Sequence, residues 1–288
     1  MVAMSTAEAA ATPRQRRRSR AGRLLLLLPV AVLYGLLMLA PIAFIVKTSF
    51  SAGLEHYRGV LATPVLWRVI ENTAVISATT TLVALVLAYA YAAALWRAKP
   101  ILRVVLLGLV LLPFWTGVLV KNFAWAALLQ DNGVILDILR GLGFDTGGLS
   151  LLHNRFAVIV GMVHYVLPYA VLPIYVTLIA IDWHLVRAAQ SLGASFPRAV
   201  WNVILPLSLP GVLAAGLLVF IVSTGFFITP IILGSPRDMM IANLVDFYAH
   251  QIVDFGGAAA LAMLVIAGVS VLVIAYQRVP KEGQYGSL

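Results

Sequence analysis

The chain has 288 residues, of which 62% are hydrophobic and only 11% carry a charge. Soluble domains average about 25% charged residues, so most of the surface of this protein must face lipid instead of water. The sequence has no cysteine, which excludes a disulfide scaffold, a thiolate metal site and a thiol nucleophile.

Six stretches without a charged residue predict six membrane-spanning helices. A spanning helix needs about 20 apolar residues to cross the hydrocarbon of a bilayer. Strands do not fit, because these stretches are apolar without alternation. In chain order the stretches are 24–46, 72–96, 104–120, 156–181, 199–236 and 255–277. The predicted fold class is therefore an all-α, polytopic membrane protein with six transmembrane helices.

Two of the six stretches do not have the length of a simple span. The stretch 104–120 has 17 residues, and it reaches across only if the helix continues past Lys121 to residue 129. The stretch 199–236 has 38 residues, which is too long for one helix. Prolines at 197, 206 and 210 predict a loop with short helices there, followed by a span at about residues 212–233.

The charged residues between the spans predict the orientation in the membrane. If the N-terminus is cytoplasmic, that side carries 13 basic and three acidic residues, and the other side carries seven basic and eight acidic residues. The net charge of +9 then divides into +10 inside and −1 outside, as basic residues favour the cytoplasm. Both termini are predicted to be cytoplasmic, and the positive charge reflects topology and not a nucleic-acid partner.

The same features predict the domain organisation. Residues 1–20 form a disordered, basic cytoplasmic tail, residues 21–279 the six-helix transmembrane domain, and residues 280–288 a second cytoplasmic tail. The first apolar stretch has 23 residues, whereas the core of a signal peptide has about 7–15, so we expect a retained helix.

The sequence carries no motif for ATP hydrolysis or for metal catalysis. No glycine is followed by lysine, as a phosphate-binding P-loop requires, and the five histidines show no ligand spacing. His164 is interpreted as a packed or hydrogen-bonding residue within a span. The chain is therefore predicted to have no catalytic residues and no metal site, so an ion gradient or a partner subunit would drive uphill transport.

The segment 182–211 is unusually apolar for a loop on the predicted cytoplasmic side. Small residues and Leu192 recur at helical spacing, Gly193 ends the turn, and Ser195 can cap a second helix. Two interpretations fit this pattern. The short helices form a contact surface for another protein, or they rest on lipid headgroups.

The segment resembles the cytoplasmic loop of binding-protein-dependent ABC importer permeases, which reads Glu-Ala-Ala-x-x-x-Gly and then Ile-x-Leu-Pro. Ala188-Ala189, Gly193 and residues 204–206 match, with one residue fewer after Ile204. The resemblance implies that residues 182–211 are a coupling loop that docks on an ATP-binding subunit. Its implied contact residues are Arg187, Ala188, Ala189, Ser191, Leu192, Gly193, Ala194 and Ser195.

Arg187 stands where the family has glutamate. We interpret Arg187 either as a partner for an acidic residue of the ATP-binding subunit or as a contact for lipid phosphates.

Two further regions resemble the spermidine/putrescine-type subgroup, in particular its first permease subunit. They are residues 113–125 with the following 131–133, and residues 229–234 with the following 240–244. The resemblance implies a type I ABC importer transmembrane fold in the bacterial inner membrane. It also implies a second permease, two ATP-binding subunits that hold ATP and Mg²⁺, and a periplasmic binding protein. This chain would bind no cofactor itself.

Polar and aromatic residues within the spans are the candidates for a translocation path. Val118, Lys121, Asn122 and Trp125 share one helical face. That face lines the path, or Lys121 snorkels towards the membrane surface while Trp125 lies in the interfacial belt. The aromatic candidates either line the path or pack against lipid and neighbouring helices. All path candidates are Trp115, Lys121, Asn122, Trp125, Tyr165, Phe226 and Phe227.

The alternative function is a secondary transporter driven by an ion gradient. Such a protein would need an inverted repeat and carboxylates near the middle of the membrane, and no acidic residue lies in the six stretches. The expected cargo is a polyamine or a related small nitrogenous solute. Ferric iron, phosphonates and sugar or amino-acid conjugates are the alternative cargoes.

Overall fold

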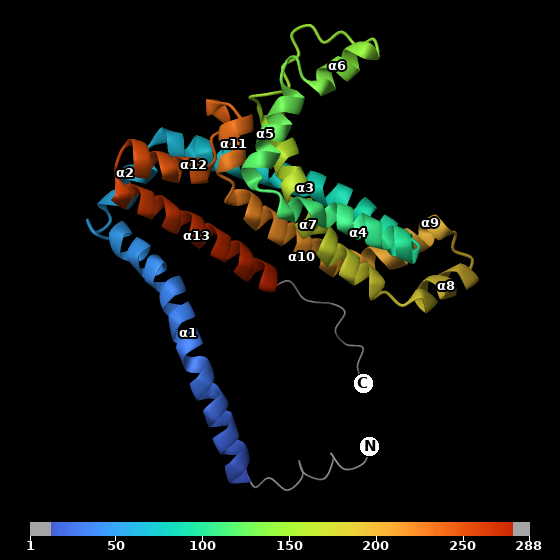
Figure 1. The fold of residues 1–288 in the computed structure, drawn as a ribbon, viewed down its shortest axis with the longest axis horizontal. Helices are drawn as coiled ribbons and strands as arrows, with labels where there is room; N and C mark the ends of the chain where they lie inside the picture. Colours follow the sequence, from blue (N-terminus) through green and yellow to red (C-terminus); the bar gives the residue numbers. More distant parts are fainter. Residues whose placement is uncertain (1–12, 279–288) are drawn as a thin grey trace.

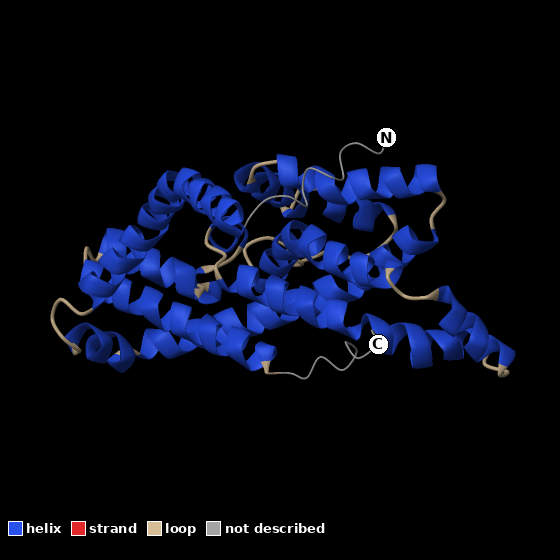
Figure 2. Cartoon of the chain, turned by 90° about the horizontal axis from the view of Figure 1, so that it is seen from below, coloured by secondary structure: helices blue, strands red, loops and turns tan. Residues whose placement is uncertain are grey.

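The computed structural model describes residues 13–278, with side-chain positions from residue 28 onwards. Within that range the chain is helical and has no strand, which confirms the predicted all-α fold class (Figure 2). Five helices are long and apolar enough to cross a membrane, and a bent pair of helices makes up to six spans.

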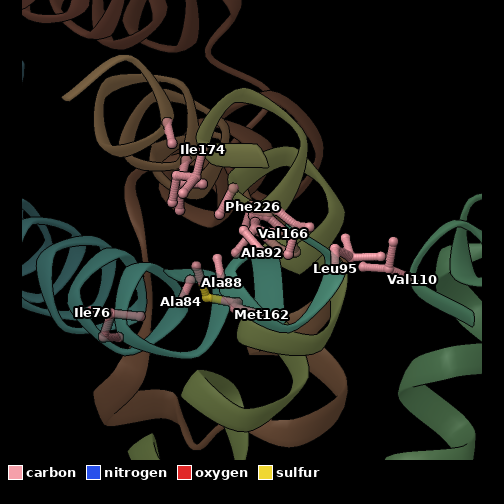
Figure 3. Close-up of a cluster of buried hydrophobic side chains, with 14 of the residues drawn as sticks. Ile76, Ala84, Ala88, Ala92, Leu95, Val110, Met162, Val166, Ile174 and Phe226 are labelled. Carbon is pink, nitrogen blue, oxygen red and sulfur yellow. The ribbon is translucent and has the colours of Figure 1, made fainter. Parts of the chain in front are cut away.

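Three long helices form the centre of the molecule: α3 (Pro64–Arg97), α7 (Arg155–Ile179) and α10 (Leu205–Thr224). They make the most extensive contacts of any helices in the chain (Figure 1). The buried face of α3 carries small residues at a spacing of four, Ala84, Ala88 and Ala92, which lie close to Met162 and Val166 (Figure 3). Small residues let helix backbones approach closely within a membrane, where no hydrophobic force pulls helices together.

A glycine brings α10 close to α7. A Cβ atom placed on Gly211 would overlap the side chain of Thr177 and would lie 3.0 Å from the backbone oxygen of Pro173. Only a residue without a side chain fits at this helix crossing.

The third span differs from the straight helix predicted through Lys121. Helix α4 (Pro100–Trp115) ends at Trp115, and the chain resumes in α5 (Val118–Leu129) and α6 (Val134–Gly141) after a bend of 103°. Pro113 lies in the last turn of α4 and Gly117 precedes α5. Helix α4 ends after Trp115, where Thr116 and Gly117 both adopt extended backbone.

The fifth span begins and ends earlier than the predicted residues 212–233. Helix α8 (Trp183–Ser191) is followed by α9 (Phe196–Ala199), a π-helical turn η1 (Val200–Ile204) and α10, and the span covers Phe196–Thr224. Pro206 is the second residue of α10, directly after the π-helical turn, and Pro210 lies inside the helix. The end of the predicted loop 182–211 is therefore helix, continuous with the span.

The helix after the fifth span is separate. Helix α10 stops at Thr224, and α11 (Ile228–Leu233) packs against α5 and α7 after a short break. A short 3₁₀ turn η2 (Pro236–Asp238), then α12 (Ile241–Asp246), a π turn η3 (Phe247–Gln251) and α13 (Phe255–Gln277) complete the described chain.

Helix α1 (Pro13–Ser49) leaves the bundle and contacts α13 near one end only (Figure 1). After it, α2 (Glu55–Ala62) packs on α13. The predicted disorder of residues 1–20 is wrong for residues 13–20, which are helical. Arginine, which makes up five of these eight residues, favours helix. Residues 1–12 and the predicted tail 280–288 lie outside the described residues.

Candidate translocation site and coupling surface

The bend between α4 and α5 directs Lys121 towards α7. The Lys121 Nζ atom donates a hydrogen bond to the backbone oxygen of Pro113 at 2.8 Å, and it lies 4.4 Å from the ring centroid of Tyr165. A carbonyl dipole and an aromatic face both stabilise an ammonium group in a region of low dielectric constant. Lys121 is half-buried and directed into the protein, instead of snorkelling freely to the membrane surface.

Aromatic rings hold Tyr165 in place. Tyr165 is stacked on Tyr169, one helical turn away, at 6.0 Å and 21°. Phe226 meets Tyr165 edge-on at 5.1 Å, and Phe114 meets Tyr169 at 5.0 Å. Pairs at these distances contribute about 0.5–1.5 kcal/mol each beyond the area they bury, so the rings form a stiff wall.

A cavity of about 170 Å³ opens beside Lys121 and this wall. It is lined by backbone and side chains of α4, α5 and α7, which bend or pair here. The lining residues are Pro113, Phe114, Thr116, Val118, Lys121, Tyr165, Pro168 and Tyr169. Of the predicted path residues, Lys121 and Tyr165 therefore line one cavity, and Phe226 supports its wall.

Asn122 and Trp125 lie on the same helix but pack away from the cavity. Asn122 is buried near Gly161 of α7, and its Nδ2 atom has no hydrogen-bond partner. Trp125 donates from Nε1 to Nδ1 of His164 at 2.9 Å. This bond agrees with the interpretation of His164 as a hydrogen-bonding residue, and it holds α5 against α7.

Trp115 and Phe227 do not join the cluster. Trp115 is 91% exposed at the end of α4, and its side chain does not line the cavity. Phe227 is half-buried, and its backbone oxygen accepts a hydrogen bond from Asn243 at 2.8 Å. Their role in a path stays a prediction that the cavity does not support.

Sequence reasoning left the second half of the cavity out of the candidate path. Phe114, Thr116 and Tyr169 line it, although none was selected. The signal was present, since Pro113 and Gly117 flank a point where a helix ends and frees a carbonyl oxygen.

A polar network at the opposite end of the bundle from α8 joins α3, α7 and η2 (Figure 1). Asn72 donates from Nδ2 to the backbone oxygen of Arg237 at 2.6 Å, and Arg155 donates to Asn72 Oδ1 at 2.7 Å. The Nε atom of Arg155 lies 3.5 Å from Oδ1 of Asp238, whose other oxygen accepts from Ser235 at 2.6 Å. The network fixes the connection between α11 and α12 to the bundle.

The predicted coupling loop forms an exposed helix at the other end. The Asp182 side chain caps α8 by accepting from the His184 N–H at 2.8 Å. Gly193 has φ of +88°, and the Ala194 N–H bonds the Ala189 oxygen at 3.1 Å. This is the helix ending that glycine favours, so the predicted end of the turn at Gly193 is confirmed.

Two aromatic contacts tie the loop to the bundle. Trp183 meets Trp96 of α3 edge-on at 5.2 Å, and the guanidinium of Arg97 lies 4.6 Å from the ring centre of Phe196. Val186 is fully buried beneath α8. Helix α8 therefore packs mainly on η1 and α9 and contacts α3 through the Trp183–Trp96 pair.

Most of the predicted contact residues face outwards. Arg187, Ala188, Ser191, Gly193 and Ser195 are exposed, whereas Ala189 and Ala194 are half-buried. Leu192 is 89% exposed, which is unusual for a leucine next to a helix end.

Ser195 precedes α9, but its side chain accepts no hydrogen bond from the first turn. Pro197, at the second helical position, has no N–H to donate, so only the N–H of Arg198 could serve such a cap.

The described part of the chain has no group of three or more His, Cys, Asp or Glu residues that could hold a metal ion.

Curated relatives agree with this architecture. The spermidine/putrescine transport system permease protein PotB of Haemophilus influenzae is 30% identical over 235 residues, covering 81% of each chain. PotB of Escherichia coli K12 is 30% identical and covers 80% of this chain and 84% of its own. The inner membrane ABC transporter permease protein YdcU of Escherichia coli is 30% identical over 54% of this chain and 53% of its own. No protein-family model matches the chain.

Solved structures share the fold. A crystal structure of a bacterial alginate ABC transporter, in complex with its alginate pentasaccharide-bound periplasmic protein, aligns with a TM-score of 0.75 at 17% identity. The alignment covers 91% of this chain and 94% of that one. A second structure of a bacterial alginate importer aligns at 0.73 over 92% of this chain and 99% of its own. At 17% sequence identity these alignments show that the fold is shared and nothing further.

The chain therefore belongs to the ABC transporter permeases, and it is a multi-pass inner-membrane subunit of an importer. Within them it belongs to the spermidine/putrescine type. The predicted family, fold and general function are confirmed.

Proposed function

We propose that the chain forms one half of the translocation path of a polyamine importer and that a second, homologous permease forms the other half. Two ATP-binding subunits hold ATP and Mg²⁺ and supply the energy, while this chain performs no catalysis. A periplasmic binding protein delivers the cargo at the end where η2 and α12 lie. Both termini and α8 face the cytoplasm.

The exposed helix α8 is the observation that carries this proposal. It projects from the end of the bundle where Arg97, Lys99 and Arg103 also lie, which is the cytoplasmic end by the positive-inside rule. The nearly bare side chain of Leu192 and the exposed Ala188 offer an apolar surface with close access to the backbone. Such a surface suits insertion into a groove of another protein.

The exposed position of Arg187 supports a contact with an acidic residue of the ATP-binding subunit. The Arg187 side chain forms no ion pair among the described residues, so its charge is free to meet a partner. Exchanging Arg187 for glutamate would then place like charges together and weaken assembly. Unchanged assembly of Arg187→Glu would favour the alternative, a contact with lipid phosphates.

Helix α1 supports the pairing with a second permease. Within its apolar span Leu28–Ser49, every residue except Ser49 is exposed or half-buried. An apolar helix that leaves its own bundle can pack against the helices of a partner subunit as well as against lipid.

The aromatic cavity and the relatives together support a polyamine as cargo. Tyr165, Tyr169 and Phe114 offer π-faces of the kind that bind organic cations. The curated relatives at 30% identity are named as permeases for spermidine and putrescine.

Reconstitution tests the function directly. The chain, coexpressed with the proteins encoded beside it, is purified and placed in liposomes that contain ATP, and uptake of labelled spermidine is measured with the binding protein present. We expect uptake that stops without ATP and is unaffected by collapse of the proton gradient. Uptake that needs the gradient and no ATP-binding subunit would establish the secondary transporter instead. Parallel uptake of iron, phosphonates and conjugates identifies a different cargo.

A further inference from the structure

The environment of the Lys121 ammonium group is unusual because it contains no acid. Among the residues whose side chains are described, Lys121 forms no ion pair. Its positive charge is met by one backbone oxygen, at 2.8 Å, and by the face of one ring, at 4.4 Å. A charge within the membrane region persists only if its surroundings compensate it, so these two groups form a binding site for a cation.

The backbone oxygen is available because α4 ends next to it. The Pro113 oxygen also accepts from the Thr116 N–H at 3.3 Å and from the Thr116 hydroxyl at 3.1 Å. In an uninterrupted helix it would instead bond the N–H four residues later, but the chain bends there. An ammonium group at this position can therefore donate a hydrogen bond to the Pro113 oxygen, and the Thr116 hydroxyl lies beside it.

The ring that faces the ammonium is held in place from two sides. Tyr169 stacks on Tyr165, and Phe226 contacts it edge-on. Phe226 is buried, so the Tyr165 ring cannot turn aside without disturbing the core. The site is therefore built before any cargo arrives.

We infer that the Pro113 oxygen and the Tyr165 ring, at the wall of this cavity, are a site for a primary ammonium group of the cargo and that the Lys121 ammonium occupies that site while the transporter is empty. A carbonyl and an aromatic face recognise any alkylammonium, since lysine and a diamine end in the same –CH₂–NH₃⁺ group. Two ammonium groups repel each other at contact distance, so they cannot share one carbonyl and one ring. The cargo enters this site as Lys121 leaves it.

Lys121 then acts as a tethered competitor. When no cargo is present its ammonium group holds the carbonyl and the ring at the wall of the cavity of about 170 Å³, and it disfavours inorganic cations there by its own charge. It also keeps the affinity for cargo low, which allows release. This role rests on the proposed function only for the identity of the cargo as an amine.

The test measures binding to the permease and its ATP-binding subunits in nanodiscs, without the binding protein. Isothermal titration with n-butylammonium, corrected for empty nanodiscs, gives the dissociation constant for wild type and variants. Lys121→Met removes the competing ammonium group, so n-butylammonium should bind about tenfold more tightly. That factor corresponds to the free energy of one moderate cation contact. Lys121→Arg retains a cation and should bind as weakly as wild type.

Substitutions of Tyr165 show whether the ring is the partner. In the Lys121→Met background, Tyr165→Phe keeps the aromatic face and should keep the tight binding, whereas Tyr165→Leu should lose it. Trp115→Ala is the matched control, since Trp115 adjoins the same bend but is exposed and does not line the cavity. If Lys121→Met does not assemble, the neutral Lys121→Gln carries the same expectation.

The inference is overturned if Lys121→Met binds n-butylammonium no more tightly than wild type. It is also overturned if adding Tyr165→Leu to Lys121→Met leaves the affinity unchanged. A failure of the cargo proposal looks different. Spermidine uptake would then be absent in wild type, while n-butylammonium would still bind Lys121→Met tightly. If wild type takes up spermidine but Lys121→Met binds n-butylammonium no more tightly than wild type, the cargo proposal stands and the proposed ammonium site is wrong.

Discussion

Gly211 gives the sharpest test of the helix packing. A Cβ atom added in Gly211→Ala would overlap Oγ1 of Thr177, lie 2.7 Å from its Cβ and lie 3.0 Å from the backbone oxygen of Pro173. No rotamer relieves contacts with a Cβ and a backbone atom, so α10 must move away from α7. Helix α10 and α7 form one of the largest helix contacts in the chain.

The magnitude follows from two opposing terms. Alanine stabilises a helix relative to glycine by about 1 kcal/mol. Overpacking a tight interface costs about 1–3 kcal/mol, and rigid neighbours place this site at the upper end. The net loss should be about 1–2 kcal/mol, which lowers Tm by roughly 2–8 °C for a chain of this size.

Gly268→Ala is the matched control for this substitution. Gly268 lies in α13, and a Cβ there would meet no atom within 4 Å. The same mutation should therefore leave Tm unchanged or raise it slightly. Tm is measured on the purified complex in nanodiscs by loss of the intact species in size-exclusion chromatography after heating. Equal Tm values for the two variants would refute the close packing of α10 on α7.

Three further outcomes are expected. Asp238→Asn should loosen the connection between α11 and α12, because the charge that faces Arg155 is lost. Protease cleavage in that connection should become faster while the core stays intact. Unchanged cleavage would show that the network is dispensable. Leu192→Ser should reduce copurification of the ATP-binding subunit. Leu142, which follows α6 and is 69% exposed, provides the control, and Leu142→Ser should leave copurification unchanged. Equal loss in both variants would argue against α8 as the contact. Gly193→Val forces a branched residue into φ of +88°, at a cost of about 1–2 kcal/mol, and should uncouple ATP hydrolysis from uptake; full coupling would contradict the need for this turn.

The spans were predictable because hydrophobicity is a property of composition. Charge-free stretches alone indicated six spans and the irregular third and fifth. What they could not place was the bend at Thr116–Gly117 or the early start of α10. Proline lies inside a helix in both regions, yet α4 ends two residues after Pro113 while α10 continues past Pro210 to Thr224. The difference depends on neighbouring helices, which satisfy or fail to satisfy the freed backbone groups.

The candidate site was predicted in part. Helical spacing placed Lys121, Asn122 and Trp125 on one face, but only Lys121 lines the cavity, and Asn122 is buried away from it. Spacing does not say which neighbour each residue meets. Only the bend directs Lys121 back to Pro113 and across to Tyr165, while Trp125 meets His164 on the same neighbouring helix.

By itself the sequence determined that lipid is the solvent and that residues 188–206 carry a loop typical of importer permeases. These are local properties of composition and short motifs. The division of charge between two faces stays a prediction. Only the tertiary structure decided that Phe114, Lys121 and Tyr165 share one cavity. They come from α4, α5 and α7, and the order of these helices along the chain does not specify how they meet, because that depends on the bend after α4 and on contacts between helices, such as the one from Lys121 to the Tyr165 ring.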